Sequence, residues 1–385
     1  MKLHTISIIP IELFTQKCAS LVKNHLLKEK YIHEVEGEET VNIFSEITAN
    51  ESELYSVSPH IDPGIYLVFY ESSACFYIEK AIEGWVLSRE SVVKELRARN
   101  SYHKEIRRNS EKLTISKIIK EIFSVTSGCE YGVSRINYVF SFYVVEGKVK
   151  GERDILNLKI LAEPSLIDLD DMKSTHPNDS IGCVDTEKIN TSYINSLPDV
   201  DISSNAKTYI TWATVVSVVD KRHFNKTKSL LVALECQLQT IWNRCYSVSR
   251  FIDKIFESTN KPRDVEDLYW NFVKTLDVAK SVLSSTYSSR ADKLFSEMIL
   301  TSKIEGEIDR LGQKIDLLEK YIDKNNQKLS KKYQKTIELL LFITALASLA
   351  QVFFPLPMSF LPTVAEYFVM AVFALVGALA IYKSR

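Results

Sequence analysis

The sequence lacks the short motifs that mark many enzymes. It contains no Walker A loop, no Gly-x-Ser-x-Gly turn and no His-Glu-x-x-His helix, and its seven histidines are dispersed. None of its six cysteines forms a Cys-x-x-Cys pair, which disfavours a structural zinc site or a thioredoxin-like motif. We therefore expect a protein that is not an enzyme, and the scattered single cysteines favour a reducing compartment.

The chain also lacks an excess of charge of one sign. Its formal net charge is -1 at neutral pH, so we expect no general attraction to nucleic acid and no direct nucleic-acid partner. The opening segment, Met1–Phe14, has only a short apolar run that Pro10 interrupts. Such a run is typical of a first strand rather than of a signal peptide, and we expect the bulk of the chain to stay in the cytosol.

Two long apolar segments stand near the end of the sequence, at Ile337–Phe354 and Val364–Tyr382. Their only charged residues are Glu338 and Glu366, close to the start of each segment. Each segment is long enough to cross a hydrocarbon core of ~30 Å at ~1.5 Å per residue. The alternative is a buried helical hairpin in a soluble core. We expect a two-helix transmembrane hairpin over residues 336–385, with a short basic tail.

The flanking basic residues predict the orientation of this hairpin. The connecting loop has no lysine or arginine, whereas basic residues precede the first segment and follow the second. They are Lys331, Lys332, Lys335, Lys383 and Arg385. The positive-inside rule then predicts a multi-pass protein of the inner (plasma) membrane with both termini in the cytoplasm.

A heptad pattern precedes the first apolar segment. Apolar residues recur there at alternating spacings of four and three, and Leu329 continues the series after Asn325. The series comprises Ile304, Ile308, Leu311, Ile315, Leu318 and Ile322. This seam predicts a coiled-coil stalk whose partner helices come from the same chain or from sibling chains, while a solvated amphipathic helix is the alternative.

The remaining segments predict a mixed α/β domain over residues 1–221, followed by long helices over 222–335. Helices are expected at 91–99, 114–128, 223–258 and 263–284. Strands are expected where β-branched and aromatic residues gather, at 64–71, 74–81, 135–147, 156–164 and 208–220. The expected fold class is therefore an α/β cytosolic domain, long helices and a C-terminal transmembrane hairpin.

This order of elements resembles the CorA superfamily of metal-ion transporters. The signature of that family is Gly-Met-Asn, usually followed by Phe, at the outer end of the first span. Here the sequence is Pro357-Met358-Ser359-Phe360, so Met and Phe match, and Glu366 can supply the acidic residue that follows in the family. The resemblance implies a CorA-like homo-oligomer, a pentamer by family geometry, that conducts cations and is gated by its cytosolic domain.

The departures from the signature bear on the ion and on the gating ligand. Ser359 is shorter than Asn and Pro357 is stiffer than Gly, so we expect a pore mouth that selects hydrated magnesium less strongly. Divergent CorA-like proteins also serve as antiviral effectors of type III CRISPR systems and answer a nucleotide second messenger. The resemblance thus implies such an effector channel. The alternatives are a magnesium or other divalent-cation transporter and a membrane-tethered scaffold that conducts nothing.

A polar stripe lies within the first apolar segment. Thr344, Ser348 and Gln351 follow one another at spacings of four and three, so they share one face of a helix. Polar side chains at this depth are expected to face water or a partner helix. The stripe predicts a pore lining, and hydrogen bonding between helices is the alternative.

Two charged clusters are candidate ligand sites. Guanidinium groups suit phosphates, so the basic segment 94–109 predicts an anion or nucleotide site, with a solvated basic surface as the alternative. Its candidate residues are Arg97, Arg99, Lys104, Arg107 and Arg108. Asp168, Asp170 and Asp171 form the second cluster, which predicts a regulatory divalent-cation site or, alternatively, a plain acidic loop.

Overall fold

The computed structural model describes most of the chain up to residue 353. The described ranges are 1–13, 16–35, 39–47, 52–57, 64–108, 114–126, 138–163, 196–197, 199–200, 206–257, 265–283 and 289–353. The chain divides into two compact units, Met1–Ile315 and Asp316–Arg385.

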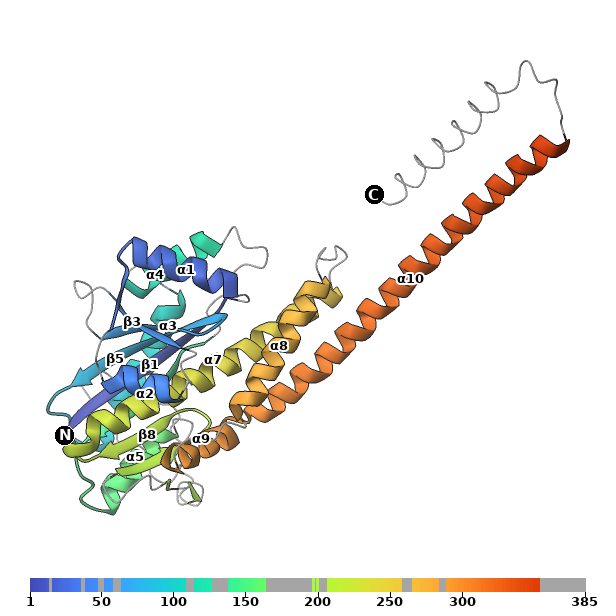
Figure 1. Cartoon of the computed structure of the whole chain (residues 1–385). Helices are drawn as coiled ribbons and strands as arrows, with labels where there is room; N and C mark the ends of the chain where they lie inside the picture. Colours follow the sequence, from blue (N-terminus) through green and yellow to red (C-terminus); the bar gives the residue numbers. More distant parts are fainter. Residues whose placement is uncertain are drawn as a thin grey trace. The chain divides into compact units, whose positions relative to one another are not determined.

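A mixed β-sheet forms the centre of the first unit (Figure 1). Its strands are β1 (Lys2–Glu12), β2 (Ile32–Glu34), β3 (Glu53–Val57), β4 (Ile65–Phe69), β5 (Ser73–Ile82), β6 (Phe140–Glu146), β7 (Ala206–Ile210) and β8 (Val215–Val219). The eight strands lie in the order β2-β3-β4-β5-β1-β6-β8-β7. Only β6 and β8 pair in parallel among the described strands, and the other neighbours are antiparallel.

Helices cover both faces of this sheet, and α8 packs on α7. The helices of the first unit are α1 (Gln16–Lys28), α2 (Glu39–Ile47), α3 (Arg89–Arg108), α4 (Thr114–Thr126), α5 (Glu152–Ala162), the short 3-10 turn η4 (Lys221–His223), α7 (Phe224–Glu257), α8 (Val265–Leu283) and α9 (Ser289–Ser302). A further helix, α10, extends over Ile304–Phe353, and the division between the two units falls within it.

Alternation along β1 assigns five of the helices to a face. Side chains of successive strand residues point to opposite faces. Ile9 and Ile11 pack in one apolar cluster with α1 and α4, and Leu3 packs in another with α3 and α5. On the opposite face His4 contacts Phe224 at the start of α7, with ring centroids 4.6 Å apart. Helix α7 follows this face, as Figure 1 shows, and is buried along most of its length.

A buried ion-pair network joins α7 to the sheet. Glu79 of β5 accepts a hydrogen bond from Lys228 of α7, with Nζ 2.8 Å from Oε1 and 3.0 Å from Oε2. The same Oε1 lies 2.5 Å from Nδ1 of His4. Burial by itself would raise the pKa of Glu79, but the bonds from His4 and Lys228 outweigh it and lower this pKa to about 2. The carboxylate is therefore held in its charged form between the sheet and the helix.

Most of the expected elements match the structure. The expected strands at 64–71 and 135–147 contain β4 and β6, the expected strand at 74–81 lies within β5, and the opening segment forms β1. The expected helices correspond to α3, which is longer than expected, and to α4, α7 and α8. These predictions of single elements are confirmed.

The strand expected at 156–164 is wrong, because this segment belongs to helix α5. The alternation of Leu156, Asn157, Leu158 and Lys159 imitates a strand, but the residues are mostly good helix formers. Glu152 and Asp154 in the first turn and Lys159 in the last turn also suit the helix dipole. The helix buries Leu158, Ile160, Leu161 and Ala162 against the sheet.

The segment expected as one strand at 208–220 forms two strands. Residues 211–214 turn the chain between β7 and β8, which then pair antiparallel. The hydroxyl of Thr211 accepts hydrogen bonds from the backbone N–H groups of Ala213 and Thr214, each at 3.2 Å, and donates to the carbonyl of Ala162 at 2.6 Å. A side chain that satisfies the backbone in this way stabilises a turn without glycine.

The predicted hairpin coincides only partly with the described residues. The first predicted span overlaps the end of α10, whereas Val364–Tyr382 and the loop before it lie outside the described residues. Within the part of the chain that the structure describes, no helix has both the length and the apolar character needed for a membrane span.

Candidate functional site

Helix α10 starts at a sharp break after α9. Lys303, between the two helices, has a φ of 55°, in the left-handed region that favours glycine. The N–H of Gly306 donates to the carbonyl of Lys303 at 3.2 Å and closes the turn. The first seam residues of α10, Ile304, Ile308 and Leu311, are buried within the first unit. The start of the predicted seam therefore packs within its own chain.

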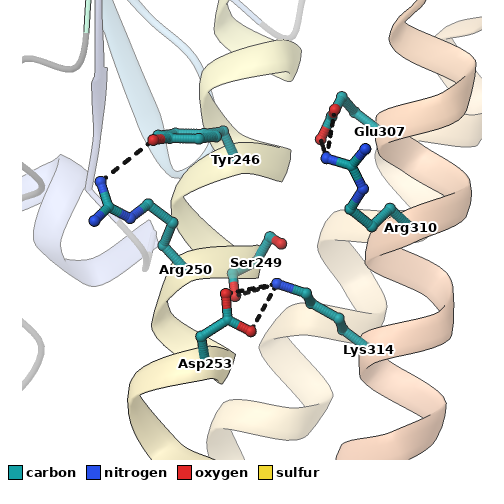
Figure 2. Close-up of polar contacts among 7 residues, drawn as sticks. All are labelled: Tyr246, Ser249, Arg250, Asp253, Glu307, Arg310 and Lys314. Atoms are coloured by element: carbon teal, nitrogen blue, oxygen red, sulfur yellow. Dashed lines mark hydrogen bonds and ion pairs between the residues drawn. The ribbon is translucent and has the colours of Figure 1, made fainter.

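An ion pair holds this first part of α10 against α7. Figure 2 shows Lys314 of α10 pointing toward Asp253 and the carbonyl of Ser249. The Lys314 Nζ lies 2.7 Å from Oδ1 and 2.6 Å from Oδ2 of Asp253, and 3.4 Å from the oxygen of Ser249. One turn earlier in α10, Arg310 pairs with Glu307 at 2.8 Å. The junction is thus polar on one side and apolar along the buried seam.

Removing the Lys314 charge tests this junction. We expect Lys314→Met to lower the free energy of unfolding by about 1 kcal/mol, because the side chain of Asp253 is 47% exposed and water screens the pair. Chemical denaturation of Lys314→Met, Asp253→Asn and the double variant measures the coupling energy. Strictly additive effects in the double variant would show that the two charges do not stabilise the junction.

An open cleft of ≈ 870 Å³ lies beside the α9–α10 break. Its described lining comes from four places: the start of β6, the end of β7 with the turn after it, the middle of α7, and the end of α9. Ser196 and Leu197, which precede β7, complete it. The aromatic residues of this lining are Tyr138, Phe140, Trp212, Trp242 and Tyr246. Lys303 lies at the same cleft, so the break between the helices is part of its wall.

The aromatic rings of the cleft are ordered against one another. Trp242 stacks on Tyr246 with centroids 5.8 Å apart and an interplanar angle of 19°. Tyr138 meets Trp242 edge-on at 5.5 Å and donates its hydroxyl to the carbonyl of Gln239 at 2.9 Å. Arg250 lies over the ring of Tyr246 and donates to its hydroxyl at 3.2 Å (Figure 2). These contacts fix the ring orientations before any ligand arrives.

The hydroxyls of the predicted polar stripe bond to their own helix. Thr344 Oγ1 donates to the carbonyl of Leu340 at 2.7 Å, and Ser348 Oγ donates to the carbonyl of Thr344 at 3.0 Å. Both residues are exposed. Gln351 also lies on α10, but its side chain is outside the described residues. The oxygens of Thr344 and Ser348 keep lone pairs for water or for a partner helix.

The structure does not bring Arg97 and Arg99 together. They stand two positions apart on α3, so their side chains leave the helix in nearly opposite directions. Arg97 is exposed, whereas Arg99 is half-buried beside Tyr143, whose pKa is raised by burial in spite of that positive charge. Lys104, Arg107 and Arg108 lie on the same helix, with side chains outside the described residues.

The other predicted site residues lie outside the described residues. They are Pro357, Met358, Ser359, Phe360 and Glu366 of the outer loop, and the acidic cluster Asp168, Asp170 and Asp171. Where the structure does describe the chain, no group of three or more histidine, cysteine, aspartate or glutamate side chains is arranged to hold a metal ion.

Comparison with known proteins adds no family to these observations. No protein-family model, curated protein or solved structure matches the chain.

The cleft was not predicted from the sequence. One signal was present, since Trp242 and Tyr246 are four residues apart on a helix and so share a face. The other lining residues Tyr138 and Trp212 lie far away in the sequence, and no local pattern connects them to this helix face.

Proposed function

We propose that the chain forms a homo-oligomeric, CorA-like channel for cations in the plasma membrane, gated by its cytosolic α/β domain. The observation that carries the proposal is the apolar surface near the end of α10. Ile337, Leu339, Leu341 and Phe342 are between 55% and 66% exposed. At about 100° per residue they cover roughly 200° of the helix circumference. An exposed apolar surface this wide needs lipid or neighbouring helices to cover it.

The polar stripe supports a pore rather than a plain anchor. Thr344 and Ser348 lie on one side of this apolar helix, with their hydrogens bonded internally. In a ring of identical helices, one such side can face a common axis and line it with hydroxyl oxygens. The other sides of the helix would meet lipid and the second span.

The packed start of α10 supports gating by the cytosolic domain. Helix α10 begins among buried residues of the first unit and continues to Phe353. A ligand can open the channel only if it binds the open and closed states with different affinity. We propose that the gating ligand is a nucleotide second messenger, as in the antiviral branch of the CorA superfamily, which this chain resembles.

Substitution of Thr344 tests the pore. We expect Thr344→Leu to lower the current through reconstituted protein about fivefold, since one lost hydrogen bond to a passing hydrated ion costs ~1 kcal/mol. The control Thr344→Ser keeps the hydroxyl and should conduct like the wild type. Both variants should keep the oligomeric state. Equal currents for Thr344→Leu and the wild type would assign the hydroxyl to helix packing instead.

A further inference from the structure

The cleft beside the α9–α10 break has a lining that core packing does not explain. Trp212, in the turn between β7 and β8, is 63% exposed, and Leu300 on α9 is 71% exposed. Both line the cleft together with the stacked pair of Trp242 and Tyr246 on α7. Large apolar side chains left open around a concave site of this size are typical of small-molecule sites.

The hydroxyl hydrogens of Thr211, Thr301 and Ser302, which line the cleft, are already bonded within the protein. Thr211 donates to the carbonyl of Ala162, Thr301 to that of Glu297 at 2.6 Å, and Ser302 to that of Ile299 at 3.0 Å. These three hydroxyls have no hydrogen left to donate to a ligand, and five aromatic side chains of the described lining offer faces and edges. Such surfaces favour a flat ring, which they can stack against or meet edge-on.

Lys303 adds a positive charge to this apolar lining. It is an exposed residue, and it is the only cationic one among the described residues that line the cleft. Its backbone is held in the left-handed region at the break between the helices. An exposed ammonium group beside an aromatic cleft can bind an anion without losing most of its hydration.

We propose that this cleft binds a small molecule that carries a planar aromatic ring and an anionic group. The ring lies among Trp212, Trp242 and Tyr246, and the anion meets the ammonium group of Lys303. This binding site is supported by the lining of the cleft alone and does not depend on the proposed channel. Its role in gating rests on the proposed function, because the ligand would contact the point at which α10 begins.

Adenosine monophosphate is a suitable probe, since it has a flat ring and a phosphate. We expect it to bind the full-length protein in detergent, as measured by calorimetry. Adenosine, which lacks the anion, should bind more weakly, and ribose 5-phosphate, which lacks the ring, should not bind. Trp212→Ala should weaken adenosine monophosphate about tenfold, the usual effect of removing one stacking aromatic ring.

Matched variants locate the site. Lys303→Asn removes the charge, and asparagine tolerates the left-handed backbone at this position, so this variant should bind the probe severalfold more weakly. Lys303→Arg keeps the charge and should bind the probe like the wild type. Trp270→Ala is the control for Trp212→Ala, because Trp270 on α8 is 66% exposed and does not line the cleft. It should leave affinity unchanged.

Two results would overturn the inference. The first is that neither adenosine monophosphate nor uridine monophosphate binds to the wild-type protein. The other is binding that Trp212→Ala and Lys303→Asn leave unchanged. Neither result depends on current through a membrane. A protein that binds the probe but does not conduct would keep this inference and contradict the proposed channel.

Discussion

Removing residues 336–385 is expected to transfer the protein from the membrane fraction to the soluble fraction. The leucine, isoleucine, valine and phenylalanine residues of each apolar segment should together favour the bilayer by roughly 4 to 5 kcal/mol, at about -0.3 to -0.6 kcal/mol for each residue and before the cost of the polar residues. The compact unit Met1–Ile315 is not touched by the deletion. Flotation of carbonate-washed membranes, followed by detection of the protein, measures the distribution.

A shorter deletion provides the control. A chain that lacks only Lys383–Arg385 keeps both apolar segments and should float with the membranes. If the full chain is recovered without detergent in the soluble fraction, the membrane part of the proposal fails. Flotation of the chain without 336–385 would instead show that another region holds it at the membrane.

Glu79→Gln is expected to lower the free energy of unfolding by roughly 3 kcal/mol near pH 7. The figure follows from the pKa of Glu79, which falls from 4.5 to about 2 in the folded protein, at about 1.36 kcal/mol for each pH unit. The substitution leaves Lys228 and His4 without their carboxylate partner between the sheet and α7. Chemical denaturation of the two proteins measures the difference.

The pH dependence gives this prediction a second readout. A carboxylate whose folded pKa is lowered stabilises the protein above the unfolded pKa, and this contribution is lost as the pH falls from about 4.5 through about 2. The difference between wild type and Glu79→Gln should therefore shrink over that window. Glu83→Gln is the control, because Glu83 pairs with Lys2 at an exposed site and its loss should change little. A difference that persists undiminished at pH 2 would contradict the electrostatic account.

Local sequence patterns were enough to predict the helices and strands whose own residues show a clear periodicity or composition. Helix α7 could be predicted because its buried residues Leu231, Leu234, Leu238 and Ile241 repeat at helical spacing. Strand β5 was predictable from its run of aromatic and β-branched residues. Helix α5 could not be predicted in this way. Its short run of alternating leucine and polar residues fits both the strand and the helix periodicity, and only packing against the sheet decides between them.

The candidate sites were less predictable than the elements. The basic segment on α3 looked like one cluster in sequence, but the helix turns Arg97 and Arg99 to different sides. The aromatic cleft joins residues from Tyr138 to Lys303, and their meeting depends on how the sheet edge, α7 and the α9–α10 break pack. Patterns read along the chain contain no information about such long-range contacts.

Native mass spectrometry of the full chain, released from mild detergent, tests the central claim most directly. The claim is that identical chains surround a common pore. The apolar surface of α10 around Thr344 and Ser348 then has to be covered by sibling chains and lipid. We predict a homo-oligomer of defined stoichiometry, five copies if the family geometry holds. A spectrum that contains only the monomer, under conditions that preserve control membrane oligomers, would contradict the account.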